Sequence, residues 1–284
     1  MRRSLLVCLI FSLFFERREA RADGANAPRT FDNSIVSGFV GLDFGARQLH
    51  YRDRVSNANL RPYDLPNGAL LPAAPGLAAS AELFPLATTG WLVARDLGLS
   101  GRTRYNFVSS RVGDISPKTR WFAWEFDVRG RIPLGPLGSA PLLGIEAGVG
   151  RDAFLFTAPG TAQDILPSVD YYYFRLAADA RIPVSVAQVL VGFGYRHLES
   201  RRGPSGATVP AAGALGEHFP NADFAAFDCK LGGALPLMEH FEARLVLSYT
   251  RYWADLKPAP GATYVAAGAT EQMLNADIGL AAYF

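Results

Sequence analysis

Acid–base chemistry in this chain would fall to its four histidines, which are His50, His197, His218 and His240. An imidazole can take a proton from water near neutral pH when a carboxylate orients it. Asp53 follows His50 closely in the sequence, and Glu199 follows His197. A surface hydrolase is therefore one hypothesis. The alternative, which we favour, is that both histidines are solvated groups at the ends of strands.

Signatures of other catalytic chemistry do not occur. The sequence has no Gly-x-Ser-x-Gly segment to place a serine nucleophile. Gly148–Gly150 and Gly192–Gly194 resemble fragments of a dinucleotide motif, but both lie in stretches of alternating polarity with no helix predicted after them. A glycine in such a stretch lets backbone or a large side chain approach closely. We therefore predict no enzymatic activity and no cofactor.

The N-terminus has the composition of a secretory signal peptide. Met1–Arg3 is basic, and Ser4–Phe15 is an apolar run too short to cross a bilayer. Small residues follow, and cleavage after Ala22 is the favoured position. The sequence thus predicts a signal peptide over residues 1–22 and a single domain over residues 23–284.

Charge balance and cysteine content exclude further classes. The formal net charge is +2, from 28 basic and 26 acidic residues, which is too small to indicate a nucleic-acid partner. Once the signal peptide is removed, Cys229 alone remains of the two cysteines, so no intramolecular disulfide is expected. No Cys/His spacing suits a metal site.

Charged and apolar residues alternate over long stretches. Phe122–Ile132 has apolar residues at even positions and charged ones at odd positions, and Asp170–Ile182 and Phe241–Ala254 behave similarly. A period of two predicts strands whose two faces meet different environments. The charged face is expected to carry Asp43, Arg47, Glu125, Asp127, Arg129, Arg131, Arg175, Asp179, Arg181, Asp228, Lys230, Glu242, Arg244 and Asp277, together with Arg102, Glu146, Asp152 and Arg196.

A proline recurs about every fifty residues, at Pro85, Pro133, Pro183 and Pro236. Because proline has no amide N–H, each marks a point where a strand leaves the sheet. Ten strands are predicted: Ile35–His50, Pro75–Phe84, Gly90–Tyr105, Thr119–Ile132, Leu142–Phe156, Asp170–Ile182, Gln188–Leu198, Ala222–Leu235, Phe241–Ala254 and Glu271–Phe284. The Ala- and Gly-rich second strand is the weakest prediction, so eight or twelve strands are the alternatives.

Long polar connections alternate with the short turns marked by proline. They cover residues 52–74, 106–118, 157–169, 199–221 and 255–270. Aromatic residues gather near the strand ends, which predicts two girdles at membrane interfaces. The girdle beside the long connections would comprise Tyr105, Trp121, Trp124, Phe154, Phe156, Tyr171–Tyr173, Tyr195, Tyr252 and Trp253. The girdle beside the turns would comprise Phe84, Trp91, Phe241, Tyr283 and Phe284.

These features together resemble the bacterial outer-membrane β-barrel proteins, over the whole mature chain. The resemblance implies an antiparallel up-and-down transmembrane barrel in the outer membrane, in contact with lipid and lipopolysaccharide. It also implies insertion by the barrel-assembly machinery, for which a terminal strand ending in Phe284 is a recognition signal. We expect a monomer. A soluble β-sandwich has the same alternation with its faces reversed, and the signal peptide and Phe284 favour the barrel.

Ten strands and this topology are also similar to the omptin proteases. The omptin site needs an Asp pair and an Asp-x-His pair, and none of the four histidines lies two residues after an aspartate. A ten-stranded barrel is only slightly wider than the eight-stranded ones that side chains fill. Phe39, Tyr171 and Tyr173 on the charged face would occupy space there. We therefore expect an occluded polar lumen and a structural or surface-interaction role, with a narrow small-solute channel as the alternative.

Overall fold

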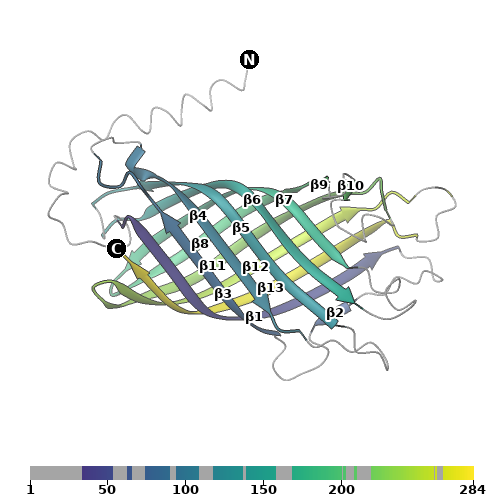
Figure 1. Ribbon diagram of the computed structural model, residues 1–284, viewed down its shortest axis with the longest axis horizontal. Helices are drawn as coiled ribbons and strands as arrows, with labels where there is room; N and C mark the ends of the chain where they lie inside the picture. Colours follow the sequence, from purple (N-terminus) through teal and green to yellow (C-terminus); the bar gives the residue numbers. More distant parts are fainter. Residues whose placement is uncertain are drawn as a thin grey trace, which may run out of the picture.

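Ten antiparallel strands form a closed barrel in the computed structural model of the chain (Figure 1). The structure describes residues 34–53, 63–65, 74–89, 94–108, 118–136, 139–157, 168–199, 201–202, 208–209, 219–258, 260 and 265–284. The predicted signal peptide lies outside the described residues. Within them, no helix has the length and the apolar character needed to cross a membrane.

Each barrel strand pairs with the next along the chain, as the predicted hairpins require. The strands are β1 (Val36–Arg52), β3 (Ala74–Leu83), β4 (Leu97–Asn106), β5 (Lys118–Pro133), β6 (Leu142–Thr157), β7 (Val169–Val184), β8 (Ala187–Leu198), β11 (Asp223–Met238), β12 (Phe241–Asp255) and β13 (Gly268–Tyr283). Three short strands lie outside this series. They are β2 (Tyr63–Leu65), which pairs with β1, and β9 (Arg201–Arg202) and β10 (Thr208–Val209), which pair with each other.

The first and last strands close the barrel. In Figure 1 the purple β1 runs beside the yellow β13, and their register extends from Ser37 opposite Tyr283 to Arg52 opposite Gly268. The backbone oxygen of Phe284 accepts hydrogen bonds from the amides of Ile35 at 2.7 Å and Val36 at 3.1 Å. Closure leaves no sheet edge among the ten strands, which a lipid environment demands.

The predicted strands agree with the observed ones to within about three residues, with one exception. Gly90–Tyr105 was expected as one strand, whereas β4 begins only at Leu97, after a 3₁₀ turn over Ala94–Asp96. The reason is the partner strand: β3 ends at Leu83, which lies opposite Leu99, so earlier residues have no β3 backbone to pair with. The Ala- and Gly-rich β3 does form, and the strand number of ten is confirmed.

Strand β5 shows which face meets which environment. Phe126 and Val128 are 52% and 55% exposed on the outside, whereas Asp127 between them is fully buried inside. Apolar outside and charged inside is the reverse of a soluble sandwich and suits a lipid exterior. The predicted fold class is therefore confirmed as a transmembrane β-barrel, a structure found in the bacterial outer membrane.

Candidate functional site in the barrel lumen

The lumen holds the charged residues expected from the sequence. We call the end where β1, β4, β6, β8 and β12 finish the loop end, and the opposite end the turn end. All of the predicted charged-face residues lie on the inner wall, most of them buried and Arg102, Asp179, Lys230, Arg244 and Asp277 partly exposed to an internal cavity. They divide into groups along the barrel axis, described below from the loop end to the turn end.

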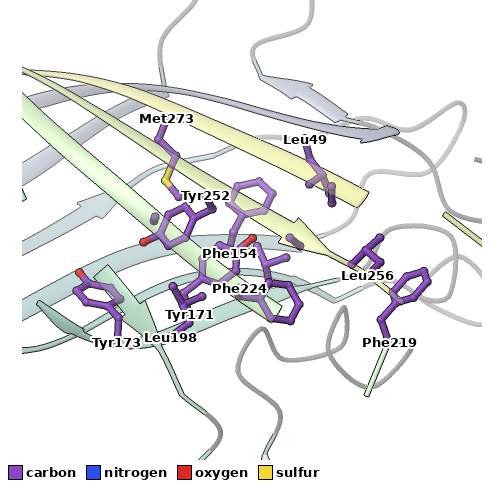
Figure 2. Close-up of a cluster of buried hydrophobic side chains, with 14 of the residues drawn as sticks. Leu49, Phe154, Tyr171, Tyr173, Leu198, Phe219, Phe224, Tyr252, Leu256 and Met273 are labelled. Carbon is purple, nitrogen blue, oxygen red and sulfur yellow. The ribbon is translucent and has the colours of Figure 1, made fainter. Parts of the chain in front are cut away.

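An apolar plug, which we call the aromatic cap, fills the lumen at the loop end. Its large side chains are Leu49, Trp121, Phe154, Val169, Tyr171, Tyr173, Leu198, Phe219, Phe224, Tyr252, Leu256 and Met273, all buried. In Figure 2, Phe154, Tyr171 and Tyr252 lie close together although they come from different strands. Phe219 and Leu256 come from connections beyond the strand ends. The cap thus forms where the long connections leave the barrel.

Ring contacts hold the cap together. Tyr171 and Tyr252 stack with centroids 4.0 Å apart, and Trp121 meets Phe154 edge-on at 6.0 Å. Aromatic pairs of this geometry contribute about 0.5–1.5 kcal/mol each beyond the area that they bury. Because the rings belong to β5, β6, β7 and β12, they connect separate parts of the barrel wall.

Arg47 lies directly beneath the cap and is fully buried. Its Nε lies 2.5 Å from Glu271 Oε1, and its Nη1 lies 3.4 Å from Asp152 Oδ1. The guanidinium carbon lies 4.5 Å from the ring centroid of Phe154. Tyr171 donates its hydroxyl to the other oxygen of Glu271 at 2.6 Å. One buried cation therefore connects the cap to the charged interior.

A set of ion pairs that we call the central network occupies the middle of the lumen. Its members are Arg102, Glu125, Arg129, Glu146, Arg175, Asp179, Arg196, Asp228 and Lys230. Within it, Arg175 places Nη1 at 2.7 Å from Glu146 and Nη2 at 2.8 Å from Asp228. The network spans the lumen because its residues come from β4, β5, β6, β7, β8 and β11.

Arg196 joins the central network to the cap. It donates to Glu125 at 2.8 Å and to Asp228 at 3.0 Å, and its Nη1 donates to the Tyr252 hydroxyl at 2.7 Å. The guanidinium also lies over the Tyr173 ring, 4.4 Å from the centroid. Buried ions in this arrangement are compensated on several sides, which is the condition for tolerating them away from water.

Glycines make room for these large side chains, as the sequence predicted. A Cβ on Gly150 would lie 2.6 Å from the Tyr173 ring, and one on Gly192 would lie 2.4 Å from Lys230 Cε. At Gly194 the nearest atom would be Asp228 Oδ2 at 2.7 Å, and at Gly148 it would be backbone. The two dinucleotide-like fragments are therefore recesses in the lumen wall.

Two aspartates face each other across the seam that closes the barrel. Asp43 of β1 lies directly opposite Asp277 of β13. Asp43 is fully buried and accepts hydrogen bonds from the amides of Asn106 and Asn275, the latter at 3.1 Å. Arg104 Nε lies 3.9 Å from Asp43. Amide donors and a nearby cation thus compensate the carboxylate of Asp43.

The turn end has its own ion pairs. Glu242 bonds both Arg181 and Arg244. Arg131 lies over the Phe84 ring, 3.5 Å from its centroid, and donates to the backbone oxygen of Ser34 at 3.1 Å. With Asp127, whose Oδ2 lies 3.6 Å from Arg102 Nη2 in the central network, these contacts account for the remaining residues of the predicted charged face.

The aromatic girdles were predicted partly wrongly. Outward-facing members include Tyr105, Trp124, Tyr195, Trp253, Phe241 and Phe284, all exposed. By contrast, Trp121, Phe154, Tyr171, Tyr173, Tyr252, Phe84 and Tyr283 are buried and point inward. The physical reason is strand parity, because neighbouring residues such as Tyr171 and Tyr172 must face opposite sides. Trp91 and the side chain of Phe156 lie outside the described residues.

The histidines do not come together. His50 on β1 and His197 on β8 are both exposed, and β13, β12 and β11 lie between their strands. His240 lies in the turn between β11 and β12, against the rings of Tyr283 and Phe284. His218 lies outside the described residues. A hydrolytic site that uses His50 together with His197 is not assembled in this structure.

Two lumen residues were missed in the sequence. Glu271 bonds Arg47, and Arg104 lies between Asp43 and Asp152, at 3.9 and 4.0 Å. Parity could have found both, since Glu271 shares the face of Asp277 and Arg104 shares the face of Arg102. Their partners depend on how the barrel curves, and a single strand carries no signal for that.

Below the cap the lumen contains a cavity of about 220 Å³. On one side its wall consists of small residues of β3, including Ala78 and Ser80. On the other side it is bounded by charged residues and by Ser248 and Thr250 of β12. Of the aromatic cap, Tyr173 lines it.

Comparison with known proteins supports no assignment beyond the fold. No family model matches the chain, and a search of curated proteins finds no match either. Among solved structures, Ail, the attachment invasion locus protein of Yersinia pestis, is 6% identical with a TM-score of 0.32, over 86% of this chain and 97% of that one. The outer membrane protein AlkL is 13% identical with a TM-score of 0.33, over 91% and 94%.

A third solved structure is the outer membrane protein OprG of Pseudomonas aeruginosa, 11% identical with a TM-score of 0.25, over 88% of this chain and 97% of that one. These values are too low to transfer a function. The description of the fold therefore rests on the closed barrel and its inverted polarity.

Proposed function

We propose that this outer-membrane β-barrel has no continuous channel and acts through the long connections at its loop end, as a surface-exposed structural or interaction protein. Long connections of outer-membrane barrels are extracellular and short turns are periplasmic. The loop end would then face the outside of the cell. The observation that carries the proposal is the aromatic cap, because it lies across the lumen at that end.

The cap is apolar and densely enough packed to oppose the passage of ions. Trp121, Phe154 and Leu49 are fully buried, and Tyr171 and Tyr252 are 2% exposed. A hydrated ion would have to shed water among apolar side chains, which costs several kcal/mol per ion after relaxation. Hydrophobic constrictions of this kind oppose conduction in channels as well.

The central network, which lies below the cap, is a second observation that supports the proposal of a closed lumen. In a conducting pore, charged side chains remain hydrated and available to passing ions. Here Arg175, Arg196 and Glu146 each bond residues on other strands and are less than a tenth exposed. Because these side chains form ion pairs with one another across the lumen, they connect different strands of the barrel wall.

The outer face at the loop end suits lipid headgroups. Arg151 lies between the rings of Phe122 and Tyr172, 4.9 Å from each centroid, and bonds Asp170 with both Nε and Nη2 at 2.7 Å. Arg120 is exposed beside them. Lipid and lipopolysaccharide are the partners that we propose, with insertion by the barrel-assembly machinery and a monomeric state.

A narrow channel for a small solute is the second candidate, and the cavity of about 220 Å³ is the observation that favours it. The cavity would serve as part of a path if the cap opened. A surface hydrolase is less favoured, because His50 and His197 lie on strands far apart around the barrel. We propose that the protein is not an enzyme.

A liposome-swelling assay with small neutral solutes such as glycerol and arabinose separates the first two candidates. Purified protein would be reconstituted into liposomes beside a matched preparation of a known porin. We expect swelling rates equal to those of protein-free liposomes for each solute. Swelling that depends on solute size and on the amount of barrel would reject the sealed lumen in favour of the channel. Heat-modifiable gel mobility would verify the fold of each preparation.

A further inference from the structure

The cavity below the cap owes its existence to β3. Apart from Glu82, the inner side chains of this strand that line the cavity are small, namely Ala78 and Ser80. Elsewhere the inner wall carries arginines, carboxylates and aromatic rings. The alanine and glycine content that makes β3 a poor strand former therefore has a structural result, because it leaves space that no other strand fills.

Seven basic and six acidic side chains line this space, and in several ion pairs the basic partner is the more exposed one. The side chain of Arg102 is 31% exposed, whereas its partner Glu146 is 2% exposed. Lys230 is 24% exposed against 10% for Asp179. In both pairs the cation is the more exposed partner, although Glu146 and Asp179 also line the cavity.

The same order recurs in two more pairs that line the cavity. Arg104 is 18% exposed and its partner Asp43 is fully buried. Arg244 is 13% exposed and its partner Glu242 is fully buried. Glu82 and Asp277 also line the space; the carboxylate of Glu82 is 19% exposed and lies 3.5 Å from Arg129. In all four pairs the cation is the more exposed partner, and the carboxylates that line the space are Glu82, Glu125, Glu146, Asp179, Asp228 and Asp277.

Two of the four cations, Lys230 and Arg104, have N–H groups that are available to bind a ligand. Arg102 is committed to Glu125 at 3.0 Å and to Glu146 at 2.6 Å. By contrast, Lys230 has one contact, with Asp179 at 3.4 Å, among the residues that the structure describes. Arg104 has carboxylates only at 3.9 and 4.0 Å, and within that same part of the chain its buried Nε has no hydrogen-bond partner.

From this arrangement we propose that the cavity binds a small oxyanion, a carboxylate or a phosphate, with Lys230 and Arg104 as its charged anchors. Charge-assisted hydrogen bonds from ammonium and guanidinium groups are strong when water is excluded. Ser248 and Thr250 line the wall from β12 and supply hydroxyl donors. The volume of about 220 Å³ lies below the roughly 300–1,000 Å³ of drug-sized sites, which limits the ligand to a small molecule.

The cap covers the loop end, and Tyr173 is the cap residue that lines the cavity. We therefore expect entry to the site from the turn end. This direction of entry rests on the proposed function, whereas the binding itself does not. A periplasmic solute would reach the site without crossing the cap.

Isothermal titration calorimetry on the intact barrel in detergent tests the proposal, with inorganic phosphate and succinate as probes and glycerol as the neutral control. The variants are Lys230→Met, Lys230→Arg and the control Lys257→Met, which removes an ammonium from the loop rim. We expect saturable binding of at least one anion and none of glycerol. Binding should weaken at least tenfold in Lys230→Met, with most of it kept in Lys230→Arg and all of it in Lys257→Met.

Absence of saturable binding of both anions to the wild-type barrel would overturn the proposal, as would equal binding by Lys230→Met. Heat-modifiable mobility of each variant shows that the barrel is folded, and if Lys230→Met does not fold, Arg104→Gln takes its place with the same expected loss. Which anion binds distinguishes phosphate from carboxylate as the ligand. Solute flux in the swelling assay would reject the proposed closed lumen but would not contradict the proposed anion site. The two proposals can therefore fail independently.

Discussion

Tyr171 and Tyr252 stack at a centroid distance of 4.0 Å although their strands are not neighbours, since β8 and β11 lie between β7 and β12. Two rings can meet in this way only where the lumen is narrow. The hydroxyl of each ring also makes a hydrogen bond to a charged residue of the lumen. Tyr171 donates to Glu271, and Tyr252 accepts from Arg196. The stacked rings therefore connect the apolar cap to the ion pairs beneath it.

Removing the stack should destabilise the barrel. Tyr171→Ala or Tyr252→Ala leaves a cavity in a buried cluster, and large aromatic truncations cost about 3–5 kcal/mol. We expect a loss of this order in urea unfolding followed by gel mobility. Tyr195→Ala, on the exposed outer face, is the matched control and should change stability far less. Equal losses in cap and control would argue against a packed cap.

Arg47 should be energetically coupled to Glu271. Arg47→Met leaves two buried carboxylates without their cation, which costs about 3–5 kcal/mol. Adding Glu271→Gln removes one of those charges, so the double variant should be less destabilised than the sum of the singles by about 0.5–3 kcal/mol. A double-mutant cycle of unfolding free energies measures this. If the free-energy changes of the two single variants simply added, the ion pair would contribute no interaction energy. Arg251→Met, on the outer face, is the control.

Glycine recesses in the lumen should differ sharply from glycines that have open space. Gly150→Ala would bring a Cβ within 2.6 Å of the Tyr173 ring, and overpacking of this kind costs about 1–3 kcal/mol. A Cβ on Gly101 meets nothing closer than 3.9 Å, so Gly101→Ala should be neutral or slightly stabilising. Thermal unfolding of the two variants compares them. A tolerated Gly150→Ala would contradict the packing described for Tyr173.

Phe284 should matter for assembly. Its side chain is exposed on the outer face at the turn end, next to the seam held by Ile35 and Val36. Phe284→Asp places a charge in that apolar band, and we expect several-fold less folded protein in outer-membrane fractions, whereas Phe284→Tyr should assemble. Wild-type levels of the Asp variant would count against Phe284 as the assembly signal.

The rim pair of Lys257 and Asp223 should contribute little, with a defined pH dependence. A hydrogen bond to Asp223 raises the pKa of Lys257, which is fully exposed in the connection after β12. A raised lysine pKa stabilises the fold below the unfolded value of about 10.4 and ceases to do so as pH rises through the folded value. Lys257→Met should therefore lower the midpoint temperature of thermal unfolding slightly at pH 7 and by less at pH 11. A difference that grew with pH would have the wrong sign.

The alternation of residues predicted most of the fold, because each strand carries its own two-residue period. The placement of Glu125, Asp127 and Arg129 inside and of Phe126 and Val128 outside follows from that period once the exterior is known to be apolar. The late start of β4 did not follow, because it depends on where β3 ends rather than on the residues before Leu97.

The cap and the ion pairs were beyond the reach of sequence analysis for a different reason. Whether Arg47 meets Glu271 or Asp152 depends on strand tilt and stagger, which are properties of the closed barrel. Grouping aromatic residues by distance from strand ends placed Tyr171 and Tyr252 in a girdle, although parity assigns them to the lumen. The cap is thus the part of the site that required three-dimensional structure.

Single-channel recording in planar bilayers tests the sealed lumen most directly. The account predicts that the wild-type barrel gives no stable conductance steps in concentrated KCl, whereas the Tyr171→Ala/Tyr252→Ala variant, verified as folded, gives steps because its cap is opened. Reproducible steps from the wild-type barrel, at an amplitude unchanged by the double substitution, would contradict it.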